Sequence, residues 1–197
     1  IGSGIDGTQT VWPDAKVFAG FAATLPMTNE SVEPLYLRPP DAKPSASAAA
    51  SSSHLRLSHE IDLAVMADIH HSCFAKGWSE ADLASTLSIP GSGALLVELA
   101  GTVYGFVQFQ WVAGEAEINT ICVSPQHRRQ HFGRDLMQGL LAQLATMNTV
   151  RVFLEVADDN DAARALYARH GFAPSGYRKA YYANGRDAIM MQRGMQP

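Results

Sequence analysis

The chain has 197 residues, of which 47% are apolar, and carries a formal net charge of −4. This length and apolar fraction are enough for one packed domain with an appendage, and the acidic balance argues against a domain that binds nucleic acid by covering many phosphates. No apolar run approaches the length of a membrane span and the start lacks the layout of a signal peptide, so a cytoplasmic protein is expected.

The first 54 residues are expected to lie outside the packed domain. The stretch PPDAKPSASAAASSS, residues 39–53, has 13 Pro, Ala or Ser residues among 15, which is typical of a semi-flexible linker. We therefore expect a leader at 1–38, a linker at 39–54 and a packed domain at 55–197.

Helical and strand patterns alternate from Leu55 onward. Helical spacing of apolar residues covers 61–74, and Ser79 is placed to cap a second helix through SEADLASTLS. The run 93–123 predicts three strands, with turn signals at Gly101 and Gly114.

The same alternation continues beyond this run. A helix is predicted from Gly133 to Met147, a strand over 150–156, a helix over 160–169 and two closing strands around GYRKAYY and DAIMMQR. Interleaved helices and strands predict a layered α/β domain with helices on both faces of the sheet.

Metal-binding and disulfide patterns are weak in this sequence. His70 and His71 are adjacent and face different directions on a helix, and no Cys, Asp or Glu completes a ligand set with them. The two cysteines, Cys73 and Cys122, fit small buried thiols. We expect no metal site.

The stretch VSPQHRRQHFGRDL, residues 123–136, is the most basic part of the chain. A strand that ends there and a helix that begins near Phe132 would leave free N–H groups at the positive end of a helix dipole, which favours a bound phosphate. Arg128, Arg129 and Arg134 add charge, and Gly133 lets backbone approach closely. The alternative is a solvated basic turn, and the stretch alone does not decide between the two.

A family resemblance spans residues 55–193. INTICVSPQHRRQHFGRDLM is similar to the acetyl-CoA-binding motif of the GNAT superfamily of N-acetyltransferases, and FAKGWSEADL, LEVADDNDAARALYARHGF and YYANGRDAIMM extend the likeness. Within that superfamily the chain resembles the RimI-type N-terminal acetyltransferases. The resemblance implies the GNAT fold, a mixed and mostly antiparallel sheet with helices on both faces, and acetyl-CoA as cosubstrate without a metal.

The resemblance also implies which residues hold acetyl-CoA. Its pantetheine arm would lie along Ile121, Cys122 and Val123, and Asn160 occupies the position of a coenzyme-contacting Asn. The diphosphate would contact the loop formed by Arg128, Arg129, Gln130, His131, Phe132, Gly133 and Arg134. His131 stands where the family normally has the first glycine of this loop. If the backbone needs a positive φ there, the residue carries a small strain, and the imidazole could either crowd the diphosphate or donate to it.

Two residues match the catalytic positions of the family. Glu155 in LEV corresponds to the general base and Tyr167 in ALYARHGF to the general acid that reprotonates the departing thiolate. Their alternatives are a solvated strand-end carboxylate and a buried core tyrosine. Trp78, Tyr181 and Tyr182 fall in segments that flank the acceptor groove of related enzymes, or they serve packing.

The resemblance implies acetylation of the α-amine of a protein N-terminus, with the N-terminal alanine of a small-subunit ribosomal protein as acceptor. A lysine side chain or a small-molecule amine is the alternative acceptor. The segments PDAKVFAGFAA and EPLYLR, within residues 8–38, resemble the C-terminal tail of TsaB, a subunit of the bacterial machinery that makes threonylcarbamoyladenosine in tRNA. This second likeness implies partners in that machinery and raises the alternative of a non-catalytic adaptor; an unstructured leader is the other reading.

Overall fold

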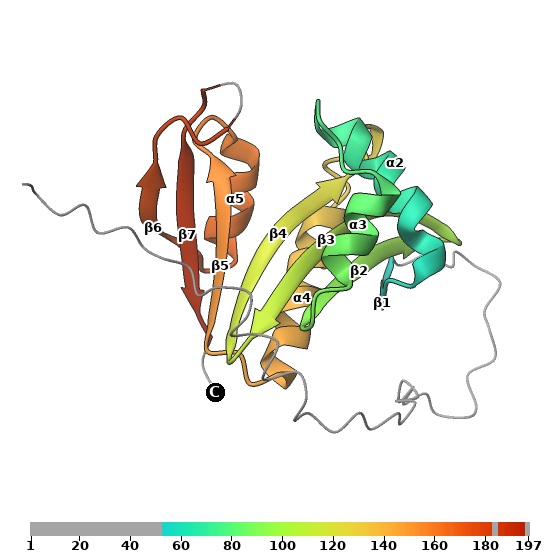
Figure 1. Ribbon diagram of the computed structural model, residues 1–197, viewed down its shortest axis with the longest axis horizontal. Helices are drawn as coiled ribbons and strands as arrows, with labels where there is room; N and C mark the ends of the chain where they lie inside the picture. The colour runs from blue at the N-terminus through green and yellow to red at the C-terminus, as the bar shows by residue number, and fades with distance from the viewer. Residues whose placement is uncertain (1–52, 183–184, 196–197) are drawn as a thin grey trace, which may run out of the picture. The chain divides into compact units, whose positions relative to one another are not determined.

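The computed structural model describes residues 53–182 and 185–195. The predicted leader, with its TsaB-like segments, and all but the end of the predicted linker lie outside these residues. The described part forms one sheet of seven strands in the order β1-β2-β3-β4-β5-β7-β6. Strands β4 and β5 pair in parallel, whereas the other neighbouring strands pair antiparallel, which confirms the expected mixed sheet (Figure 1).

The strands and α-helices follow the predicted order, with one added strand. The strands are β1 (His54–Leu57), β2 (Ser92–Leu99), β3 (Thr102–Val112), β4 (Glu115–Val123), β5 (Arg151–Ala157), β6 (Ala173–Arg178) and β7 (Ala188–Gly194). The helices are α2 (Leu63–Cys73), α3 (Glu80–Leu87), α4 (Phe132–Thr146) and α5 (Asp161–Arg169), with the short 3₁₀ helices η1 (Glu60–Asp62) and η2 (Pro125–His127). Strand β1 was not predicted, because four residues are too few to show an alternation.

Local sequence explains the predicted caps and turns. Ser79 and Asp82 form a capping box at α3, in which the Ser79 hydroxyl accepts from the Asp82 N–H at 3.2 Å and the Asp82 carboxylate accepts from the Ser79 N–H at 2.8 Å. The β3–β4 turn has left-handed backbone at Ala113 and Gly114, with φ of 50° and 87°. Two consecutive positive φ values are typical of a type I′ hairpin turn, which matches the turn predicted from Gly114.

Helices cover both faces of the sheet. On one face Leu136, Leu140 and Leu144 of α4 are fully buried against the strands, and on the other face Met66 of α2 and Leu83 of α3 are fully buried (Figure 1). Burial of each such side chain stabilises the fold by about 1.5–3 kcal/mol. Among the described helices, none is both long and apolar enough to cross a membrane. The two layers hold β4 from opposite sides.

Candidate active site

Strands β4 and β5 separate halfway along their length. Their parallel pairing ends at Ile118↔Leu154, although β4 continues to Val123 and β5 to Ala157. Figure 1 shows the two strands diverging. Because no strand of the described residues pairs with this side of β4 beyond Ile118, its backbone faces an opening in the sheet.

A β-bulge at Asn119 lies at the point of separation. The residues on either side of it pair with consecutive residues of β3, so Asn119 is the extra residue of the bulge. An extra residue reverses the alternation of side chains from there on. Ile118, before the bulge, packs in the core beneath α4, and Cys122, after it, packs in the core beneath α2.

Ile121 and Val123 direct backbone groups into the opening. The Ser124 N–H donates to the Tyr104 carbonyl at 2.9 Å. Because backbone groups alternate in direction along an antiparallel pair, those of Val123 and Ile121 face away from β3. The Val123 carbonyl accepts there from Arg128 Nε at 3.3 Å. An extended ligand arm can therefore bind along β4 as a short strand would.

Cys122, the third predicted contact along β4, pairs with Phe106 of β3 and its side chain is buried. Its thiol lies 3.4 Å from Thr120 Oγ1 and within hydrogen-bonding reach of Cys73. The hydrogen bond with Cys73 and then burial raise the pKa of Cys122, whereas the same hydrogen bond lowers the pKa of Cys73 to about 6. Cys73 is therefore the more acidic of two neighbouring thiols beside the opening.

The loop after β4 leads into a helix N-terminus with free donors. The first helical hydrogen bond of α4 runs from the Asp135 N–H to the His131 carbonyl at 3.0 Å. The N–H groups of Phe132, Gly133 and Arg134 have no acceptor within the described part of the chain. Together with the positive end of the helix dipole they form a site suited to a phosphate group.

Arginine side chains surround these donors. Arg128, Arg129 and Arg134 are all exposed, as is Gln130. The Asp135 carboxylate lies 3.2 Å from Arg134 and balances part of its charge, which leaves Arg128 and Arg129 as the stronger attraction for an anion.

Two residues of the loop attach α4 to the domain. Phe132 is buried and stacks on Tyr104, with ring centroids 5.1 Å apart. Gly133 faces α5, where an added Cβ would lie 3.5 Å from Leu166 Cδ2. Both residues therefore hold the helix N-terminus in place in addition to presenting their N–H groups.

His131 has a left-handed backbone conformation. Its φ is 70° and its ψ is −3°, a region that the family's usual glycine adopts without strain. The residue is exposed and its side chain makes no capping hydrogen bond. A non-glycine residue in this region costs on the order of 1 kcal/mol. The loop therefore keeps its conformation without the usual glycine, at a small cost in stability.

A pocket of about 370 Å³ adjoins the bulge of β4. It collects Glu155 and all three residues predicted to flank an acceptor, and it adds residues that the sequence did not indicate. The lining residues are Trp78, Thr86, Glu117, Ile118, Asn119, Glu155, Tyr181 and Tyr182.

Glu155 lies in this pocket among polar partners. Its carboxylate forms an ion pair with Arg178 at 3.2 Å, and its side chain is 18% exposed. A hydrogen bond with Glu155 raises the pKa of Tyr181 to about 12, and the Arg178 guanidinium lies over the Tyr181 ring at 5.3 Å. Glu155 is thus held in position while it remains accessible to a ligand in the pocket.

Glu117 is a second carboxylate of the pocket, and sequence reasoning missed it. Its strand pattern, EAEIN, shows only the alternation of exposed and buried residues that any half-buried strand has. Burial of its carboxyl and then the charge of Glu155 raise the pKa of Glu117, although the residue as a whole is exposed. The proximity of the two carboxylates depends on the β4–β5 register, which no local pattern reveals.

Trp78 is held on the pocket wall by His70. The backbone N–H of Trp78 donates to His70 Nδ1 at 2.9 Å, and the indole and imidazole rings stack with centroids 4.7 Å apart. Burial lowers the pKa of His70 to about 4, so this imidazole is neutral at pH 7 and keeps Nδ1 as an acceptor. His70 is thereby a structural support for the pocket.

Tyr167 lies on α5, outside the pocket lining. It is 5% exposed and packs against Phe172, with ring centroids 6.1 Å apart. Burial, followed by the nearby Cys122, raises its pKa, so the hydroxyl retains its proton at neutral pH. Asn160 caps the same helix, since its side chain accepts from the Ala163 N–H at 3.2 Å. This cap places α5 beside the end of β5.

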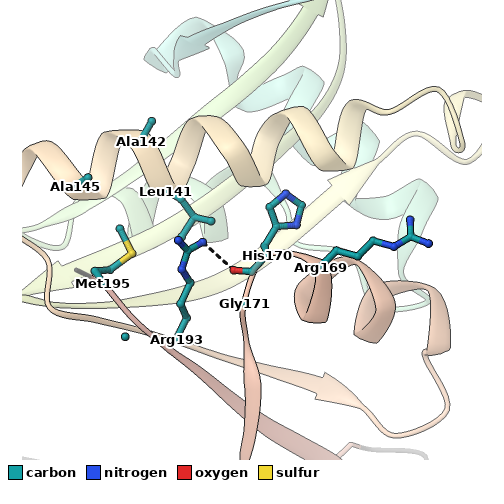
Figure 2. A pocket seen from close by; sticks show the side chains of 9 residues that line it. Leu141, Ala142, Ala145, Arg169, His170, Gly171, Arg193 and Met195 are labelled. Carbon is teal, nitrogen blue, oxygen red and sulfur yellow. Dashed lines mark hydrogen bonds between the residues drawn. The ribbon is translucent and has the colours of Figure 1, made fainter. Parts of the chain in front are cut away.

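A larger cavity of about 750 Å³ lies elsewhere, between α4, the end of α5 and β7 (Figure 2). Arg193 crosses it and donates to the His170 carbonyl at 2.8 Å. It contains none of the predicted site residues and no carboxylate among its lining residues. The smaller pocket is therefore the candidate site, because it combines a base, aromatic walls and the opening along β4. Among the described residues, no three His, Cys, Asp or Glu side chains gather into a possible metal site.

Comparison with known proteins identifies relatives of this chain. The family model described as the acetyltransferase (GNAT) family matches residues 63–172. A ribosomal protein bS18-alanine N-acetyltransferase of Escherichia coli is 36% identical over 135 residues, covering 66% of this chain and 89% of that protein. The N-alpha-acetyltransferase RimI of Mycobacterium tuberculosis is 35% identical over 121 residues, covering 59% of this chain and 75% of that protein.

A solved structure agrees with these sequence matches. The crystal structure of the ribosomal-protein alanine N-acetyltransferase from Escherichia coli superposes with a TM-score of 0.70 at 30% identity, covering 74% of this chain and 96% of that one. The likeness therefore covers nearly the whole of that chain.

Proposed function

The chain belongs to the acetyltransferase (GNAT) family, and we propose that it transfers an acetyl group from acetyl-CoA to the α-amine of a protein N-terminus. The acceptor that we propose is the N-terminal alanine of ribosomal protein bS18, the acceptor in the name of the Escherichia coli relative. The observation that supports the proposal is a pocket lined by Glu155 and by Asn119, at the point where β4 and β5 separate, from which β4 leads on to the free N–H groups of α4.

The proposed coenzyme site has two parts. The diphosphate would accept from the N–H groups at the start of α4 and lie among Arg128 and Arg129, while the pantetheine arm would bind the backbone of Ile121 and Val123. When bound, acetyl-CoA supplies a thioester whose carbonyl carbon is the electrophile.

The proposed chemistry uses two side chains of this chain. Glu155 takes a proton from the acceptor's ammonium, directly or through a water molecule, and the neutral amine then attacks the thioester carbon. The C–N bond forms as the C–S bond breaks, and Tyr167 donates its proton to the departing thiolate. Its raised pKa keeps the hydroxyl protonated at neutral pH, as a general acid requires.

Two other roles remain as alternatives. A lysine side chain or a small-molecule amine would use the same machinery with a different acceptor. A non-catalytic adaptor, linked to tRNA-modification proteins through the N-terminal segment, is motivated only by the resemblance of residues 8–38, which lie outside the described residues.

A peptide panel tests the proposed function. The protein is incubated with acetyl-CoA and a peptide that begins with the alanine of bS18, and the products are read by mass spectrometry. The matched controls are the same peptide with a blocked N-terminus and a blocked peptide with one internal lysine. Acetylation of only the free N-terminus is the expected result. Modification of the blocked lysine peptide would transfer the assignment to a lysine acceptor, and no modification of any peptide would contradict the proposal.

A further inference from the structure

Glu117 lies beside Glu155 on one face of the sheet. It pairs across the β4–β5 ladder with Phe153, two residues before Glu155, so the two carboxylates project to the same side. Both line the 370 Å³ pocket. Glu117 is also one residue before the point at which the strands separate, where an acceptor would meet the coenzyme arm.

The charge of Glu117 is not balanced as that of Glu155 is. Arg178 forms its ion pair with Glu155, and among the described residues no ion pair within 4 Å includes Glu117. The other lining residues are aromatic, apolar or neutral polar groups, and none is a lysine or arginine. Arg178 also attracts Glu117 at longer range, but one guanidinium faces two carboxylates, so the pocket keeps an excess negative charge that favours a cationic ligand.

The α-amine of a peptide has an ordinary pKa of about 7.7–8.0, so at pH 7 it arrives mostly as an ammonium. Trp78, Tyr181 and Tyr182 line the same pocket and form its aromatic walls. We propose that Glu117 binds the ammonium of the incoming N-terminus and positions it for deprotonation by Glu155. This inference rests on the proposed N-terminal acetylation.

The proton balance separates the roles of the two carboxylates. Glu155 accepts one proton, so that its O–H bond forms as one N–H bond of the ammonium breaks. The bound ammonium favours the ionised form of Glu117. When the amine attacks the thioester carbon, its nitrogen regains positive charge, and Glu117 stabilises that charge until the second proton leaves. This proton returns to the Tyr167 phenolate that protonation of the thiolate has produced, which restores the acid.

Glu117→Gln tests this role by binding as well as by rate. The affinity of the bS18 peptide with a free N-terminus is measured on protein saturated with CoA, and the N-acetylated form of the same peptide serves as a reference that lacks the ammonium. We expect Glu117→Gln to lower the affinity for the free peptide by about tenfold or more, because a charged hydrogen bond is lost. The affinity for the acetylated peptide should change by less than about twofold. Glu117→Asp keeps the charge and should restore part of the affinity.

Glu115→Gln is the matched control. Glu115 lies two residues away on β4, and its partner is the exposed Arg151 at 3.7 Å, outside the pocket. This variant should bind both peptides as the wild type does. In steady state, Glu117→Gln should raise the KM for the peptide while the KM for acetyl-CoA is unchanged, which also shows that the variant is folded.

The outcomes distinguish the two proposals. Equal affinity of the wild type and Glu117→Gln for the free peptide would overturn the role of Glu117 and leave the acetylation intact. An equal loss of affinity for the free and the acetylated peptide would show a structural effect of the substitution and would also overturn the role of Glu117. A wild type that acetylates no peptide would instead contradict the proposed function.

Discussion

Replacement of His131 with glycine changes one side chain and relieves one unfavourable backbone conformation. The residue caps α4 with a φ of 70°, and its exposed imidazole makes no capping hydrogen bond. A left-handed conformation costs an L-residue about 1–2 kcal/mol, with histidine at the low end, whereas glycine adopts it freely. Glycine also increases the entropy of the unfolded chain, which offsets about 0.4–1 kcal/mol of the stabilisation gained by relieving the strain. The net change in unfolding free energy should therefore lie between about 0 and +1 kcal/mol.

His131→Ala separates the backbone effect from the imidazole. Alanine removes the ring but keeps a Cβ in the left-handed region, so this variant should be less stable than His131→Gly by about 1 kcal/mol. For a domain of this size, that difference corresponds to roughly 2–4 °C in Tm. Thermal unfolding of the two variants, followed by circular dichroism in the same buffer, measures it.

Coenzyme affinity supplies the second half of this test. The N–H donors of Phe132, Gly133 and Arg134 are unchanged in both variants, so the Kd for acetyl-CoA should remain within about threefold of the wild type. Isothermal titration gives both values. If both variants bind acetyl-CoA tenfold more weakly, the imidazole is a phosphate ligand; a destabilised His131→Gly would refute the strain argument.

Three further predictions concern catalysis, thiol chemistry and the leader. Glu155→Gln should lower turnover at pH 7 by about a hundredfold, with partial recovery at higher pH as more free amine is present. The loss in Tyr167→Phe should not recover, since raising the pH supplies no acid. Profiles of rate against pH at saturating acetyl-CoA measure both effects, and wild-type turnover by Glu155→Gln at pH 7 would exclude Glu155 as the base. The hydrogen bond with Cys122 lowers the pKa of Cys73 to about 6, so the rate of Cys73 alkylation should be constant above about pH 7 and should decrease at pH values under 6. Mass spectrometry of labelled peptides measures this rate, and an inflection near the ordinary thiol pKa would contradict the prediction. Deletion of residues 1–52 should leave peptide acetylation nearly unchanged, because a Pro-, Ala- and Ser-rich linker transmits few contacts, and an insoluble or inactive product would show that the boundary is misplaced.

Local sequence predicted much of the fold because local interactions determine it. The cap of α3 depends on Ser79 and a carboxylate three residues later, and the β3–β4 turn depends on Gly114, so both could be read from adjacent residues. The glycine usual at the position of His131 indicated that a positive φ could occur there, and the structure has one. Strand β1 was not predicted, because its four residues form a strand only by pairing with β2.

The sequence by itself determined the order of the elements, the basic loop before α4 and, through the family resemblance, the identity of Glu155 and Tyr167 as candidate catalytic residues. Only the tertiary structure decided where β4 and β5 separate, because that point depends on the bulge at Asn119 and on pairing between distant strands. The same non-local register brought Glu117 next to Glu155. Alternation along a strand specifies which face a side chain occupies, but neighbours on that face are chosen by the pairing of strands far apart in the chain.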